Sequence, residues 1–152
     1  MDEHAYASLQ KKYGLPDFHV LDVEFEISSI EEEGLILRGV CKKIRERIEV
    51  VIDVIEHVLQ PDTNSYIDMY ECKFFSGSEK DSLFVLLKHV MHSYRSLLEV
   101  EIVQDEKLYA QFIKDFFGEW QNLKKSLLPF FSKLKAVWKE TKQDKAKLEY
   151  LG

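Results

Sequence analysis

Two histidines, His89 and His92, come closest in this sequence to the residue type and spacing of a metal site. Residues three positions apart lie on the same side of a helix, so both imidazoles can reach one ion, with Glu99 two turns further along. No second carboxylate stands at helical spacing beside either histidine, and the Glu-x-x-His pairs of a di-iron bundle do not occur. A solvated polar face is therefore the favoured interpretation, with His89 and His92 as weak metal candidates. We expect no metal and no cofactor.

The motifs of nucleophilic and phosphoryl-transfer chemistry do not occur in this sequence. Ser8 and Ser132 are each followed by a lysine three positions later, which matches only a two-residue pattern. There is no Gly-x-Ser-x-Gly, no Cys-x-x-Cys, no glycine-rich phosphate loop, and no arginine followed by a histidine after four to six residues. We therefore expect a protein that is not an enzyme.

Lysines near the C-terminus are the strongest candidates for binding. The formal charge of the chain is −6, yet residues 121–152 carry eight lysines and three acidic side chains. Lys135, Lys139 and Lys142 fall on one helical stripe, which suits contact with phosphates or with an acidic protein face. The segment has no arginine and the rest of the chain is acidic, so nucleic-acid or ribonucleoprotein binding is the alternative rather than the leading hypothesis.

The composition indicates one soluble, helix-rich domain over residues 1–152. The chain is 45% hydrophobic and 32% charged, with six glycines and three prolines. No apolar run approaches the roughly 18 residues that span a bilayer, and the N-terminus lacks the features of a signal peptide. Cys41 and Cys72 show no paired spacing, which is typical of reduced thiols. We therefore expect a cytoplasmic protein with no membrane association.

Apolar residues that alternate at spacings of four and three predict three long amphipathic helices. The predicted ranges are 29–60, 79–103 and 105–141. Ser29 and Glu32 form a capping-box pattern at the start of the first helix, and Pro61 ends it. Gly34 lies on the apolar face of this helix. The absence of a side chain there lets another helix approach closely. A break in this helix near 34–39 is the competing account.

The second and third helices carry signals of their own at their ends. Ser78 with Asp81 predicts a capping box for the second helix, and Asp105 predicts an N-cap for the third. The apolar register of the third helix is kept across Pro129. One continuous, kinked helix is therefore favoured over two separate ones.

Shorter elements complete the predicted fold. They are an N-terminal segment of two short helices within 1–27, a short helix at 65–75, and a basic tail at 142–152. Short connections make successive long helices antiparallel neighbours. The predicted fold is all-α: an antiparallel bundle of three long helices with the short N-terminal helices packed across it, four to six helices in total.

At about 1.5 Å per residue, the third helix is predicted to be longer than the second by several turns. Its last turns carry Phe130, Phe131, Leu134 and Trp138, which the N-terminal helices, the first long helix or another protein must cover. Cover from within the chain is the simpler account, and a partner or self-association is the alternative, because monomers rarely expose large apolar patches. We therefore expect a non-enzymatic protein-interaction or assembly module, with a homodimer as one form, that presents this aromatic and lysine-rich end.

Overall fold

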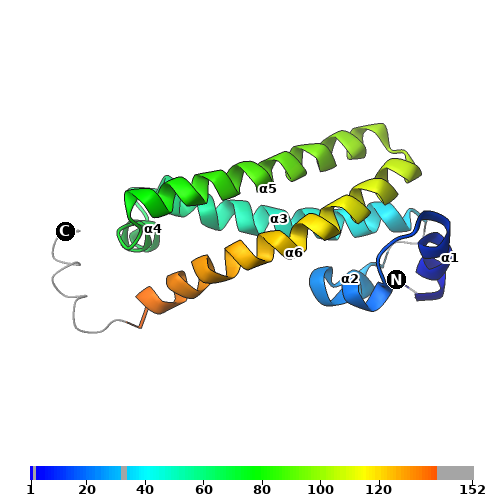
Figure 1. Cartoon of the computed structure of the whole chain (residues 1–152), viewed down its shortest axis with the longest axis horizontal. Coiled ribbons are helices and arrows are strands. Elements are labelled where there is room, and N and C mark those ends of the chain that lie inside the picture. The colour runs from blue at the N-terminus through cyan, green and yellow to red at the C-terminus, as the bar shows by residue number, and fades with distance from the viewer. Residues whose placement is uncertain (2, 32–33, 140–152) are drawn as a thin grey trace.

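The protein folds into three long helices that lie side by side, with shorter helices at both ends (Figure 1). The computed structural model describes residue 1 and residues 3–31 and 34–139, and none of these residues is in a strand. The helices are α1 (Glu3–Tyr13), α2 (Phe18–Phe25), α3 (Ile36–Leu59), α4 (Tyr66–Cys72), α5 (Gly77–Val103) and α6 (Glu106–Val137), with a 3₁₀ turn, η1 (Ile27–Ser29), after α2. The predicted all-α fold is confirmed. None of the helices in the described ranges is both long and apolar enough to cross a membrane.

The first long helix begins later than the sequence predicts. α3 starts at Ile36, whereas Ser29 ends the turn η1, so the predicted start and capping box are wrong. Gly34 precedes the helix with a φ of +141°, a conformation that L side chains rarely adopt. The close approach that was expected at Gly34 occurs instead at Gly39, where an added Cβ would lie 2.9 Å from Cγ2 of Ile30. The segment that precedes α3 therefore packs on Gly39 through Ile30, where the sequence predicted the first turns of the helix.

A capping box begins α5. The Ser76 hydroxyl accepts a hydrogen bond from the backbone N–H of Glu79 at 3.2 Å, and the Glu79 carboxylate accepts one from the backbone N–H of Ser76 at 2.8 Å. The predicted box of Ser78 and Asp81 is therefore two residues too late, although the mechanism is the one predicted. The predicted C-terminal end of this helix is confirmed.

A tight turn joins α5 to α6. Gln104 adopts a left-handed conformation with a φ of 58°, and the Asp105 carboxylate then accepts from the backbone N–H of Lys107 at 2.8 Å. The predicted N-cap is confirmed. α6 runs without interruption through Pro129, also as predicted, and ends at Val137, short of the predicted end at 141.

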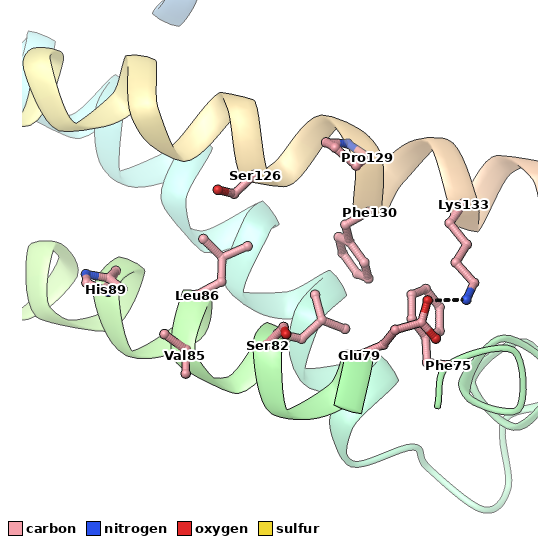
Figure 2. A pocket seen from close by; sticks show the side chains of 11 residues that line it. Phe75, Glu79, Ser82, Val85, Leu86, His89, Ser126, Pro129, Phe130 and Lys133 are labelled. Atoms are coloured by element: carbon pink, nitrogen blue, oxygen red, sulfur yellow. Dashed lines mark hydrogen bonds and ion pairs between the residues drawn. The ribbon is translucent and has the colours of Figure 1, made fainter. Parts of the chain in front are cut away.

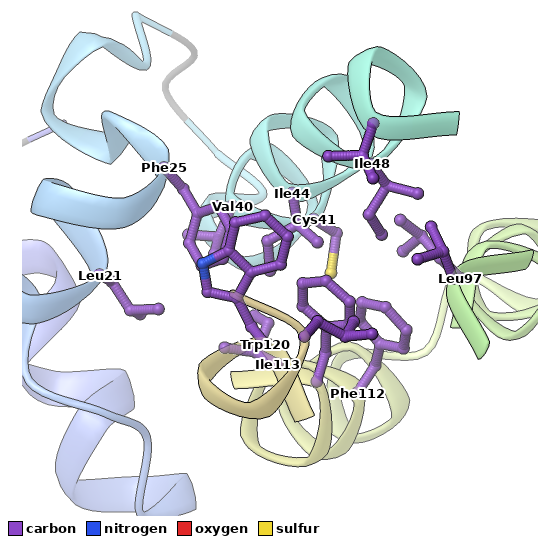
Figure 3. Close-up of a cluster of buried hydrophobic side chains, with 14 of the residues drawn as sticks. Leu21, Phe25, Val40, Cys41, Ile44, Ile48, Leu97, Phe112, Ile113 and Trp120 are labelled. Carbon is purple, nitrogen blue, oxygen red and sulfur yellow. The ribbon is translucent and has the colours of Figure 1, made fainter. Parts of the chain in front are cut away.

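The hydrophobic core lies where α3, α5 and α6 face one another (Figure 3). The predicted stripes of α3 and α6 are buried: Leu37, Cys41, Ile44, Ile48, Val51, Ile55 and Val58 on α3, and Tyr109, Ile113, Phe116, Trp120, Leu123, Leu127, Phe130, Leu134 and Val137 on α6. α5 buries fewer side chains, namely Leu83, Val90, Ser93 and Leu97. Other apolar side chains of α5 stay at the surface, with Phe84 53% and Val85 50% exposed.

The helix α2 covers one end of the furrow between α3 and α6 (Figures 1 and 3). The ring of Phe25 lies 5.6 Å from that of Trp120 and 6.1 Å from that of Phe116. Beside these rings the Glu24 carboxylate accepts a hydrogen bond from the indole N–H of Trp120 at 2.8 Å and forms an ion pair with Lys124. α2 is thus held by an apolar contact with a polar bond at its edge.

Glu24 makes this attachment sensitive to pH. Burial raises the pKa of Glu24, but hydrogen bonds from Lys124, Trp120 and Gln121 lower it more, so the net shift is downward. A lowered pKa adds stability that is present above the unfolded value of about 4.3 and is lost as pH falls through the folded value. We expect Glu24→Gln to reduce the free energy of unfolding at pH 7 by about 1 kcal/mol and to flatten its fall in acid.

Urea titrations at a series of pH values measure this effect. The variant Glu99→Gln, at an exposed position of α5, serves as the control and should keep the pH dependence of the parent protein. An acid limb equally steep in Glu24→Gln and in the parent would show that Glu24 is not its source.

Candidate functional site

The predicted partner surface at the end of α6 is mostly covered. Phe130 and Leu134 are buried and Phe131 packs partly buried against the core, whereas Trp138 is 53% exposed. The indole N–H of Trp138 donates to the Glu71 carboxylate at 2.8 Å, so its polar edge is bound within the chain. These four side chains therefore do not form one continuous exposed patch.

The cover comes from α4 and the residues that follow it. The Tyr70 hydroxyl donates to the backbone carbonyl of Val137 at 2.9 Å, and its ring centroid lies 4.7 Å from that of Trp138. Phe75 places its ring 5.5 Å from that of Phe130. The N-terminal helices, which the sequence offered as a cover, lie at the opposite end of the bundle (Figure 1). This alternative is therefore wrong, whereas the simpler account, cover from within the chain, agrees with the burial of Phe130 and Leu134.

The predicted lysine stripe is only partly described. Lys135 and Lys139 are exposed, and Lys142 lies outside the described residues. Two further lysines of α6, Lys124 and Lys133, form ion pairs with glutamates of α2 and α5. The positive charge of this helix is therefore partly neutralised within the chain.

The two candidate histidines lie at the surface of α5. His89 and His92 are both exposed, and both line a hollow between α5 and α6. No set of three or more His, Cys, Asp or Glu side chains in the described part of the chain is arranged to hold a metal ion. His89 and His92 therefore line a surface hollow and do not belong to such a set.

A groove runs between α5 and α6 (Figure 2). The two helices meet at their connecting turn and diverge towards α4 (Figure 1). Two adjoining hollows of 480 and 740 Å³ fill the diverging part. Both hollows are lined by Val85, Leu86, His89 and Ser126, so they form one continuous depression, called here the α5/α6 groove.

The floor of the α5/α6 groove is apolar. Phe75, Leu83, Leu123 and Phe130 line it with exposures of 6–9%, and the more exposed Val85 and Pro129 stand at its sides. Polar and charged side chains stand around the floor: Glu79, Ser82, Lys88, His89, His92, Glu119, Asn122, Ser126 and Lys133. An apolar floor with a polar surround is the usual composition of a site that binds a protein segment.

The charged groups around the groove are bound within the chain. Lys133 contacts the Glu79 carboxylate at 2.6 Å (Figure 2), and this bond, with the backbone N–H of Ser76, lowers the pKa of Glu79 to about 2. Glu119 accepts a hydrogen bond from the Ser93 hydroxyl at 2.9 Å. The ammonium of Lys88 lies 5.4 Å from the centre of the Phe84 ring. The two glutamates and two lysines that line the groove therefore balance in charge.

The groove was not predicted, although a run of apolar residues in the sequence of α5 is a signal for it. Phe84, Val85, Leu86 and Leu87 are consecutive apolar residues, and a helix packed on one neighbour needs only some of them. The divergence of α5 from α6 leaves part of this apolar face open.

The α5/α6 groove has an apolar floor and a polar surround. Its function must be inferred from these residues alone. No protein-family model, no curated protein and no solved structure matches this chain.

Proposed function

We propose that this protein is a non-enzymatic protein-interaction module that binds an amphipathic helix of a partner protein in the α5/α6 groove. The observation that supports this is a contrast between two furrows of the same bundle. α2 fills one end of the furrow between α3 and α6 with Phe25, whereas no described segment lies over the apolar floor between α5 and α6. A groove with an apolar floor and the half-exposed Val85 at its side is the kind of surface that a further helix covers in a helical bundle.

The shape of the groove suits a helix. On α5 the lining residues run from Glu79 to His92, and on α6 from Glu119 to Lys133. At about 1.5 Å per residue these stretches are roughly 20 and 21 Å long. A partner helix of three to four turns, with apolar residues at positions i, i+3, i+4 and i+7, matches this length.

The charges of the groove favour an apolar partner face. Glu79, Lys133 and Glu119 already have partners within the chain, so an incoming helix gains little from opposing them. The same neutrality makes the groove a poor surface for a nucleic-acid backbone, which needs unpaired cations. The binding energy would come from burial of apolar side chains, at about 25 cal/mol per Å².

The proposed site includes part of the predicted binding surface at the end of α6, but it uses a different side of that helix. Phe130 and Lys133 belong to the predicted aromatic and lysine-rich end, and both line the groove. The alternative of nucleic-acid or ribonucleoprotein binding would use Lys135 and Lys139 instead. Strong weakening of binding by salt would identify that alternative, since released counterions dominate such complexes.

A displayed library of helical peptides, each with apolar residues at i, i+3, i+4 and i+7, tests the groove directly. Peptides selected on the protein should shift amide resonances of groove residues. We expect Val85→Glu to weaken them about tenfold or more, because a carboxylate would then enter an apolar interface. The matched control is Leu128→Glu on α6, which is 61% exposed and does not line the groove, and it should bind as the parent does.

Two results would overturn the proposal. One is a library that yields no binder, and the other is a set of binders that Val85→Glu and Leu128→Glu affect equally. Light scattering on the free protein separates a partner from a second copy, since a dimer that Val85→Glu dissociates would place another molecule of this chain in the groove.

A further inference from the structure

The two hollows of the α5/α6 groove differ in how their polar side chains are paired. In the hollow of 480 Å³, Glu79 and Lys133 form an ion pair with each other, and His89 lies at the opposite end (Figure 2). Six polar side chains line the adjoining hollow of 740 Å³: Lys88, His89 and His92 on α5, and Glu119, Asn122 and Ser126 on α6. A helix that fills the groove must therefore lie against a paired set of charges at one end and against the histidines at the other.

The two histidines are the ionisable side chains of the larger hollow that lack a partner. Neither imidazole forms a hydrogen bond or an ion pair with any residue that the structure describes. Lys88, by contrast, holds its ammonium 5.4 Å from the centre of the Phe84 ring. Because His89 and His92 are exposed and three positions apart on α5, one group of a partner can contact both imidazoles.

Glu119 is the one carboxylate that lines this hollow, and it has another partner. Its Oε2 atom accepts a hydrogen bond at 2.9 Å from the hydroxyl of Ser93, which is 4% exposed. With neutral imidazoles, Lys88 and Glu119 balance in charge. Protonation of His89 or His92 therefore gives the hollow a net positive charge that no carboxylate of the described chain is placed to offset.

We propose that the helix bound in the α5/α6 groove carries an aspartate or glutamate against His89 and His92, and binds more tightly as pH falls from about 8 to 6. This inference rests on the proposed function, since the groove must first bind a helix. Imidazole changes its charge between about pH 5 and 8, whereas a carboxylate stays ionised at pH 6 and above. A carboxylate of the partner thus gains an opposite charge in mild acid, whereas a wholly apolar face would bury that charge without compensation.

The groove also determines where this acidic residue lies along the partner helix. On α6, Phe130 lines the smaller hollow and Asn122 lines the larger one, eight positions away. Eight residues of helix are about 12 Å long. The acidic side chain is therefore expected about seven or eight positions from the apolar side chain that packs over Phe130.

Fluorescence anisotropy with peptides selected from the displayed helical library tests this inference. Selection at pH 6 should enrich aspartate or glutamate at that position, and the selected peptides should bind about fivefold more tightly at pH 6 than at pH 8. Replacing the acidic residue of the peptide by its amide should remove this gain. The double variant His89→Gln/His92→Gln should remove it too. His19→Gln, at an exposed histidine of α2 outside the groove, is the matched control and should retain the gain.

The outcomes distinguish this inference from the proposed function. Peptides that Val85→Glu weakens, but whose affinity is equal at the two pH values or falls in acid, overturn the acidic partner and leave the helix-binding groove intact. A gain in acid that survives His89→Gln/His92→Gln also overturns this inference, because other groups would then be its source. A library without binders overturns both proposals.

Discussion

Trp120→Ala should lower the free energy of unfolding by about 3–5 kcal/mol, the range measured when a large aromatic side chain is deleted from a core. Trp120 is 6% exposed, and its ring lies 5.6 Å from that of Phe25 and 5.9 Å from that of Phe116. Its indole N–H also donates to Glu24, so the variant leaves a carboxylate with one partner fewer. The loss therefore combines a cavity, a lost ring contact and a lost hydrogen bond at the place where α2 meets α6.

Trp138→Ala is the matched control for this result. The same residue type is deleted, but Trp138 is 53% exposed and lies beyond the last turn of α6. Its loss should cost about 1 kcal/mol, as for a half-exposed contact. Urea unfolding followed by far-ultraviolet circular dichroism measures both variants. Equal losses in the two would show that the contact between α2 and α6 contributes little to stability.

Tyr70→Ala should lower the free energy of unfolding by about 3 kcal/mol and expose the end of α6. Tyr70 is 7% exposed, its ring packs against Trp138 and Phe74, and its hydroxyl donates to the carbonyl of Val137. The variant removes the side chain through which α4 is bound to α6. Binding of the dye ANS should increase, because apolar side chains of the last turns of α6 then meet water.

Tyr66→Ala, on the same short helix, is the control for Tyr70→Ala. Tyr66 is 76% exposed, so its loss should change stability by less than about 0.5 kcal/mol and leave dye binding as it is in the parent. Strong dye binding by the unmodified protein, equal to that of Tyr70→Ala, would contradict the view that α4 covers this end.

The sequence by itself determined the helices and the faces that they bury. Apolar residues spaced by four and three along α3 and α6 must share one side of a helix, so burial of Ile44, Ile48, Ile113 and Phe116 followed from periodicity alone. Asp105 was predictable as a cap for the same reason, because its side chain bonds backbone groups only two and three residues away. Such local features do not depend on the rest of the fold.

The tertiary structure decided where α3 begins and what covers the end of α6. Ser29 and Glu32 satisfy the local pattern of a capping box, but packing of Ile30 on Gly39 and the left-handed region at Gly34 place the start of α3 at 36. Nothing in the spacing of the aromatic residues on α6 identifies α4 as their cover, because that depends on the path of the chain after α3.

The same limit applies to the α5/α6 groove. An apolar side chain such as Val85 has the same spacing in the sequence whether its own chain covers it or not, and the divergence of α5 from α6 leaves it open. Periodicity determines the face of a helix, whereas the neighbour of that face is set by the direction in which each connection turns the chain.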